Sequence, residues 1–475
     1  MALLKLTVIA DTHYYDDSLG TAGGAYELRS ASDQKCLAET DAILSAAFQT
    51  IAESDCDAVL LAGDLTNDGE RICHEKMREK LYRLQKHKRV FVTTATHDWC
   101  CDGNPRRFAG DCVYTDVETV PHEELYDFYD DFGTAAARDK FMTHLGTASY
   151  LADLSEDVVL LALNDDQNGK GKAGYKADHL QWILETVRRE TAAGKTVIGM
   201  QHHLLYPHLS PLVTNGCCCG DRDELSEQLC NAGLRLMFVG HSHIQRIDRY
   251  VSENGNELIE VNVGSLCGYP APMVQAEITA DGIRIHTDFL KSFSYNGKTV
   301  DAQSYLRAHA VHLIGGVLDT LAYGDRQAMA KKLDSFGMPD AQKIAESYGG
   351  ILQFAARKSL TLTVGKVYRI LRCLPVKTGF SAQDIEAMRN VPLTDIANDL
   401  LLAALSGEPA GAQKPSAYTN ILRAAGELPL KMLLAFHIDS EKAQAFCTEL
   451  CNLITELCTG GALDNHTLKI SRKNR

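Results

Sequence analysis

The stretch AVLLAGDLTNDGE, residues 58–70, begins with an apolar run and turns polar at Gly63 and Asp64. A short apolar run that ends abruptly at a glycine is typical of a buried strand. The carboxylates of this stretch therefore lie where the predicted strand ends. Other apolar runs, LTVIA, RVFVTTA, KTVIGM and LRLMFV, end in the same way in polar clusters: Asp11-Thr12-His13, Thr96-His97-Asp98, Gln201-His202-His203 and Gly240-His241-Ser242-His243.

These clusters share one position relative to the predicted strands. In open α/β sheets the carboxyl ends of the strands meet at one edge, where ligands bind. Each cluster alone has a structural explanation, because aspartates occupy turns and helix caps, and a single histidine is more often a hydrogen-bonded structural residue than a ligand. Their joint occurrence at strand ends makes coincidence the weaker explanation. We therefore predict a metal site.

The alternation of runs in the first part of the chain predicts βαβ units. Amphipathic stretches that favour helices separate the runs and cover residues 34–53, 71–86, 178–193 and 222–232. Residues 246–288 contain only strand-like runs between turn residues, so we expect a mixed sheet, or two sheets face to face with outer helices. Beyond Asn296-Gly297 the periodicity is helical. We predict an α/β domain over residues 1–295 and an all-α domain over 296–475.

Composition restricts the class of protein. The 475 residues, 45% hydrophobic and 23% charged, match ordinary folded domains and suffice for two or three of them. A net charge of −14 argues against a general nucleic-acid binder. No stretch has the roughly 18–20 apolar residues that a membrane helix needs, and the first residues predict a strand and not a signal peptide. We expect a cytoplasmic protein that does not act at a membrane.

The fifteen cysteines indicate reduced thiols, because their number is odd and several are adjacent in the chain. Cys447, Cys451 and Cys458 recur on one helical face, which favours a place in the core. Cys100-Cys101 and Cys217-Cys218-Cys219 follow two of the polar clusters. An incidental role is the simpler interpretation of these loop thiols, and metal ligation or redox sensing is the alternative.

The residue types of the clusters indicate a particular chemistry. Imidazoles and carboxylates without a cysteine set favour Mn, Fe or Zn over calcium or magnesium. A carboxylate that bridges two such ions makes a two-metal site, which suits attack of metal-bound hydroxide on phosphorus. A histidine that is not a ligand then protonates the leaving alkoxide, and His97 is the candidate.

The order D-x-H, G-D-x-x-x-D-G, x-x-H-D, H-H and G-H-x-H resembles the calcineurin-like metallophosphoesterase family, over roughly residues 1–290. The stretches GDLTNDGE, LYDFYDDFG and NVGSLCGYP look like a bacterial branch of that family, here with a C-terminal helical extension. The resemblance implies an α/β/β/α sandwich of two mixed sheets. It also implies a phosphatase or phosphodiesterase with a dinuclear metal centre.

The resemblance assigns a role to each cluster. His97, oriented by Asp98, would be the acid or phosphate-stabilising residue, and His203 would lie behind the ligands. Six residues would bind two ions and share Asp64 between them: Asp11, His13, Asp64 and His243 for one ion, and Asp64, His202 and His241 for the other.

Thr96 departs from the family pattern, in which an asparagine precedes the histidine of the third cluster. A threonine hydroxyl is a poorer neutral ligand on a shorter arm. Either the second site still fills, with Thr96 or water, or one ion is held weakly. We expect a hydrolase for a phosphate mono- or diester, with a small molecule or a phosphoprotein as substrate. The alternative is a degenerate phosphoesterase fold that acts as a metal-binding interaction module through its helical domain.

Overall fold

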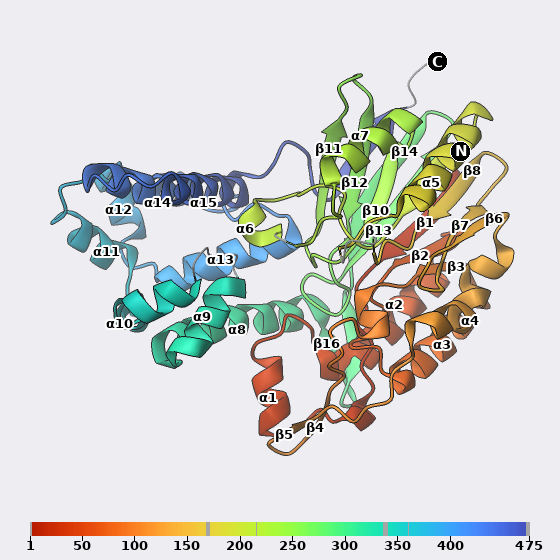
Figure 1. Cartoon of the computed structure of the whole chain (residues 1–475). Coiled ribbons are helices and arrows are strands. Elements are labelled where there is room, and N and C mark those ends of the chain that lie inside the picture. The colour runs from red at the N-terminus through yellow and green to blue at the C-terminus, as the bar shows by residue number, and fades with distance from the viewer. Residues whose placement is uncertain (1, 168–171, 215, 336–340, 360, 472–475) are drawn as a thin grey trace. The chain divides into compact units, whose positions relative to one another are not determined.

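The computed structural model describes residues 2–167, 172–214, 216–335, 341–359 and 361–471. They form two compact units, of which the first carries both large sheets and the second consists of helices (Figure 1). Both units are discontinuous in the sequence: the first comprises Met1–His208, Cys217–His309 and Leu463–Arg475, and the second Leu209–Gly216 and Ala310–Ala462. We keep a division at residue 295 as a proposal for the domain boundary.

The first sheet has six strands in the order β17-β14-β13-β1-β2-β3. Strands β1, β2 and β3 are parallel, and β13, β14 and β17 continue the sheet in antiparallel pairs. The strands cover Ala2–Ile9 (β1), Ala58–Ala62 (β2), Arg89–Thr93 (β3), Pro272–Thr279 (β13), Gly282–Phe289 (β14) and Thr467–Ser471 (β17).

The second sheet has seven strands in the order β11-β12-β10-β9-β8-β7-β6. It is also mixed, with parallel pairing from β12 through β8 and antiparallel pairing at both edges. The strands cover Asp139–Met142 (β6), Ala148–Asp153 (β7), Val158–Ala162 (β8), Thr196–Met200 (β9), Leu236–Val239 (β10), Arg246–Val251 (β11) and Glu257–Asn262 (β12).

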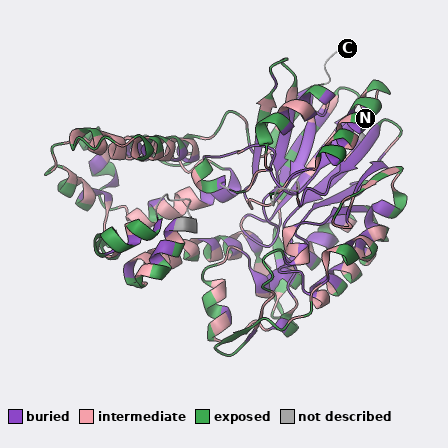
Figure 2. Ribbon diagram, in the orientation of Figure 1, coloured by how far each residue is buried: buried purple, intermediate pink, exposed green. Residues whose placement is uncertain are grey.

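The two sheets pack face to face over an apolar core. Leu6, Leu60 and Phe91 of the first sheet meet Leu160 and Phe238 of the second in one buried cluster. Figure 2 shows the strands as the buried layer of this unit. The outer faces are covered by α2 (Thr40–Glu53) and α3 (Arg71–Gln85) on one side and by α5 (Ala177–Ala192) and α7 (Arg222–Ala232) on the other. The predicted α/β/β/α sandwich of two mixed sheets is confirmed.

The region after residue 296 is rich in helix, as predicted. Its helices are α8 (Ala302–Tyr323), α9 (Arg326–Ser335), α10 (Ala341–Ser359), α11 (Val364–Leu371), α12 (Ala382–Met388), α13 (Leu393–Ser406), α14 (Ser416–Ala435) and α15 (Glu441–Thr459). Two strands of this region, β16 (Lys298–Asp301) and β17, depart from the all-helical prediction. β17 is short, but its Ile470 is buried in the core between the sheets.

Shorter elements complete the described chain. They are α1 (Gly24–Ser30), α4 (Leu125–Tyr129), α6 (Pro211–Thr214), β4 (Arg107–Ala109), β5 (Cys112–Tyr114) and β15 (Ser292–Tyr295). Among the described residues, none of the helices combines the length and the apolar character required to cross a bilayer.

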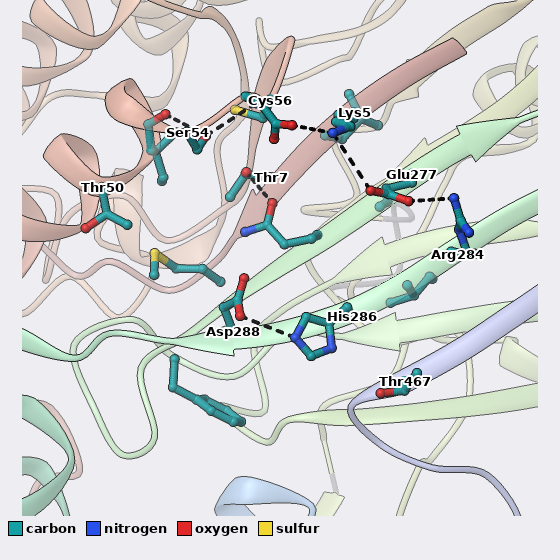
Figure 3. A pocket seen from close by; sticks show the side chains of 18 of the residues that line it. Lys5, Thr7, Thr50, Ser54, Cys56, Glu277, Arg284, His286, Asp288 and Thr467 are labelled. Atoms are coloured by element: carbon teal, nitrogen blue, oxygen red, sulfur yellow. Dashed lines mark hydrogen bonds and ion pairs between the residues drawn. The ribbon is translucent and has the colours of Figure 1, made fainter. Parts of the chain in front are cut away.

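A hollow of about 1050 Å³ lies beside β1, β13 and β14 (Figure 3). Several of its polar side chains pair with one another: Glu277 with Arg284 at 2.9 Å, and His286 with Asp288 at 3.3 Å. Lys5 lies 3.9 Å from the other carboxylate oxygen of Glu277. Because these paired groups are exposed to water, their interactions are weak, and the hollow is a solvated face of the sheet.

Candidate metal centre

Strands from both sheets deliver the predicted clusters to one place. The parallel ladder of β1 and β2 continues past the strand ends, because Asp11 N–H donates to Gly63 O at 3.2 Å and His13 N–H donates to Asp64 O at 3.0 Å. These bonds hold the first two clusters side by side. The clusters follow five strands: Asp11 and His13 follow β1, Asp64 follows β2, Thr96 to Asp98 follow β3, His202 follows β9, and His241 and His243 follow β10.

The potential ligand atoms converge. In each of three groups the nitrogen and oxygen atoms lie within 4.8 Å of one another. Asp64 belongs to two of these groups. The groups are Asp11, His13 and His243; His13, Asp64 and His97; and Asp64, His202 and His241.

The donor set fits divalent cations. His202 Nε2 lies 3.1 Å from Asp64 Oδ2, and His243 Nε2 lies 3.4 Å from Asp11 Oδ1. Ring nitrogens also face each other, His13 Nε2 and His243 Nε2 at 2.9 Å and His241 Nδ1 and His202 Nε2 at 3.1 Å. Buried imidazole lone pairs and carboxylates that crowd together in this way suit cations of the Mn, Fe or Zn type.

The backbone and neighbouring side chains fix the direction of the rings. The Nδ1–H of His202 donates to Ala62 O at 2.9 Å, and that of His243 donates to Gln34 Oε1 at 3.2 Å. In both histidines this arrangement directs Nε2 into the cluster. Such partners behind a ligand set its tautomer and its basicity.

The backbone at the site is strained. Five of the clustered residues have positive φ: Asp11 (51°), His13 (39°), Asp64 (49°), His241 (67°) and His243 (58°). Non-glycine residues rarely adopt this conformation, and it concentrates at functional sites. Glycine is needed between them, because a Cβ at Gly63 would lie 2.5 Å from His202 Nδ1 and one at Gly240 would lie 2.5 Å from Asp11 Oδ2.

Electrostatics keep the two aspartates charged. Burial alone would raise the pKa of Asp11 and of Asp64, but His243 and His202 respectively face them, and both pKa values lie well below their usual range. Burial opposes protonation of His202, yet Asp64 raises its pKa well above the ordinary value. Burial, followed by the charge of Lys35, lowers the pKa of His13 to about 3. The site therefore offers ionised carboxylates beside at least one neutral imidazole.

His97 lies at the edge of the cluster, and Asp98 does not orient it as predicted. The Asp98 carboxylate accepts hydrogen bonds from Thr66 N–H and Ala95 N–H, both at 2.9 Å, and so fastens the backbone of two motif loops together. The ring of His97 is held instead by Asp68, whose Oδ1 lies 3.3 Å from Nδ1, and by Asn67 O. The adjacent position of Asp98 in the sequence misled the assignment, because its side chain turns away into the core.

Asp68 is itself fixed by a cation. Arg106 donates to both of its carboxylate oxygens, Nε to Oδ2 at 2.9 Å and Nη2 to Oδ1 at 3.0 Å. This bidentate pair orients the carboxylate toward His97. Burial and Lys35 lower the pKa of His97, but Asp64 and Asp68 outweigh them and the net pKa is raised. His97 is thus poised to carry a proton.

Other predicted residues take peripheral places. His203 N–H donates to Asp165 Oδ2 at 2.7 Å, and the ring of His203 packs on that of His241 with centroids 4.2 Å apart. Cys219 lies 3.8 Å from Asp165. Among the described residues, the three metal-binding groups contain no cysteine. Cys447 and Cys458 are buried within their helical unit, as the helical spacing indicated, whereas Cys451 on the same face is only partly buried.

Sequence reasoning missed three residues that support the ligands. Gln34 receives the hydrogen bond of His243, and Ser265 Oγ donates to Asp11 O at 2.8 Å. Asp68, not Asp98, holds His97. Ser265 belongs to the quoted NVGSLCGYP stretch and Asp68 to the G-D-x-x-x-D-G motif, so both carried a signal. Gln34 lies in a loop that no motif marks.

Comparison with known proteins identifies one family. The model of the family described as calcineurin-like phosphoesterase matches residues 4–245. Among solved structures, a dimetal phosphatase from Danio rerio is 12% identical with a TM-score of 0.44, covering 64% of this chain and 100% of that one. The purple acid phosphatase PPD1 from yellow lupin is 12% identical with a TM-score of 0.41, covering 63% of this chain and 52% of that one. Curated proteins give no match.

Proposed function

The chain belongs to the calcineurin-like phosphoesterase family, and from this premise we propose that it hydrolyses a phosphate mono- or diester at the centre formed by Asp11, His13, Asp64, His202, His241 and His243. The predicted resemblance is confirmed, and the enzyme is a metallophosphoesterase that acts on phosphoric ester bonds. The substrate class, a small phosphate ester or a phosphoprotein, and the native metals, Mn, Fe or Zn, belong to the proposal.

One observation supports this function above the others. The carboxylate of Asp64 lies in two groups of potential ligands, and the ring of His97 joins one of them. A purely structural metal site has no use for a half-buried histidine at its rim that is held by its own carboxylate. The arrangement matches hydrolysis, in which a group outside the ligand set must handle a proton.

The proposal divides the work among the residues. Bound divalent ions would supply charge stabilisation at the phosphoryl oxygens and a nucleophile derived from water near neutral pH. Asp11 and His243 would hold one ion, His202 and His241 the other, and Asp64 would join them. His97 would donate its proton to the leaving oxygen, and Asp68 would keep its ring directed at that position.

The test compares His97→Ala with wild type after loading with manganese. We expect cleavage of 4-nitrophenyl phosphate or its diester by wild type, and a loss of about 10² to 10⁴ in kcat for the variant, which is the usual contribution of acid–base catalysis. Metal content, measured by elemental analysis, should stay the same in both proteins. Equal inactivity of both under every metal tried would contradict the proposal and favour the interaction-module alternative.

A further inference from the structure

A buried lysine lies beside the metal centre without a direct partner. The side chain of Lys35 is only 5% exposed. Its backbone N–H donates to Asp33 Oδ1 at 3.1 Å, but among the described residues no hydrogen bond or ion pair reaches its ammonium group. An ammonium group removed from water is costly unless an anion or an acceptor compensates it. Asp33 does so only in part, since its other carboxylate oxygen pairs with Arg29 at 2.7 Å.

The loop that carries Lys35 is fastened to the site on both sides. The preceding residue, Gln34, accepts from His243 Nδ1 at 3.2 Å and donates to His243 O at 3.4 Å. The following residue, Cys36, donates its N–H to Cys267 O at 2.9 Å. Lys35 therefore stands at a fixed place next to a clustered histidine, and its position does not depend on a free loop.

The charge of Lys35 reaches the groups that surround the reacting centre. After burial, it is the largest influence that lowers the pKa of His13, and it also opposes protonation of His97. It also helps to lower the pKa of Asp68, the carboxylate that holds His97. The charge of Lys35 thus acts on groups on more than one side of the cluster, including the half-buried His97 at its edge.

From this geometry we propose, building on the proposed function, that Lys35 binds a terminal phosphoryl oxygen of the substrate and makes the enzyme prefer phosphomonoesters to diesters. A centre that is positively charged when loaded with cations gives an unpaired ammonium only one favourable partner, an anion. A lysine is a compact point charge that suits a phosphate oxygen.

The preference follows from counting oxygens. A monoester has three terminal phosphoryl oxygens, so two can face the paired ligand groups while the third meets Lys35. A diester has two, because a second ester group takes the place of the third, and it also carries less negative charge. Lys35 can therefore bind the third terminal oxygen of a monoester, whereas a diester has no third charged oxygen to offer it.

The experiment uses full-length, manganese-loaded protein with 4-nitrophenyl phosphate and bis(4-nitrophenyl) phosphate, which share one leaving group. The uncharged variants are Lys35→Met and Lys35→Gln, so that one can replace the other if it does not fold. We expect kcat/KM for the monoester to fall about 10- to 100-fold, as for a lost charged hydrogen bond, and that for the diester about threefold or less. Lys35→Arg should keep most of the monoester rate.

A second readout does not depend on turnover. Calorimetry with inorganic phosphate should show a Kd raised by a similar factor in Lys35→Met and unchanged in Lys76→Met, an exposed control on α3. Equal losses on both esters, or unchanged phosphate binding, would mean that Lys35 only balances buried charge, and the inference would fall. A wild type that cleaves neither ester under any metal would instead refute the proposed function.

Discussion

The two sides of the metal centre are built unequally. On one side, Asp11 brings a carboxylate of its own to His13 and His243. On the other side, His202 and His241 are grouped with the carboxylate of Asp64, while Asp11 Oδ1 lies farther away, 4.0 Å from His202 Nε2. Thr96 stands where the family pattern places an asparagine. In the proposed arrangement, an ion on the Asp11 side would have the carboxylates of Asp11 and Asp64, whereas an ion on the side of His202 and His241 would have that of Asp64. From this difference we propose that the two sides bind their ions with unequal affinity and that the carboxylate of Asp64 serves both.

Removal of the Asp64 carboxylate should weaken metal binding on both sides of the centre. Asp64→Asn takes charge from both sides at once, so we expect less than one ion per chain and a rate lowered by at least about 1000-fold, the equivalent of several kcal/mol of lost transition-state stabilisation. Elemental analysis and steady-state kinetics on 4-nitrophenyl phosphate measure both quantities.

The matched variant is Asp11→Asn, which removes an equally buried carboxylate from one side only. It should lose the ion of the Asp11 side and retain binding by His202 and His241. If both variants lost the same amount of metal, Asp64 would not be shared and the two sides would not be separate sites.

The second prediction distinguishes the role of Asp68, which lies beside His97, from that of Asp98, which binds backbone N–H groups. Asp68→Asn removes the anion beside His97, so the pKa of His97 should fall and the alkaline limb of the pH–rate profile should move to lower pH. We expect kcat/KM to fall about 10- to 100-fold, as for other residues that orient a functional group. The pH profile is the deciding measurement, because a merely structural defect would not shift it.

Asp98→Asn is the control for this change. Its new amide group would face Ala95 N–H or the Thr66 donors, which leaves a buried donor without an acceptor and costs about 1–3 kcal/mol of stability. A lower melting temperature with an unshifted pH profile is the expected result. A shift of the profile in Asp98→Asn but not in Asp68→Asn would restore the original assignment of Asp98.

The sequence predicted the sandwich and the position of the clusters because both depend on local patterns. A short apolar run indicates a buried strand, and five such runs end in clusters that contain aspartate or histidine. What it could not predict depends on side-chain direction and on contacts between distant segments. Asp98 follows His97 directly in the sequence and was therefore the expected partner, but its side chain turns to Ala95 N–H and Asp68 lies beside the ring.

Contacts between segments that are far apart in the chain were also not predictable from the sequence. Gln34 contacts His243 across more than 200 residues, and β17 joins β14 after a long helical region. Neither contact leaves a periodic pattern, since a short loop and a short edge strand carry few constraints on residue type. The two sheets were therefore predictable in kind, while the strand that completes the first one was not.

The smallest effect we predict is a gain in metal affinity on the side of His202 and His241, produced by one substitution. Thr96→Asn restores the amide oxygen of the family pattern at a half-buried position, so the affinity for the second manganese ion should rise about tenfold while the first ion is unaffected. Thr96→Val has nearly the same shape as threonine but no donor atom, and it should weaken the second ion only if the hydroxyl contributes. Calorimetric titration of metal-free protein resolves the two affinities. If Thr96→Asn left stoichiometry, affinity and rate unchanged, the Thr96 side would not be limited by its missing ligand, and the asymmetry would have to come from the single carboxylate alone.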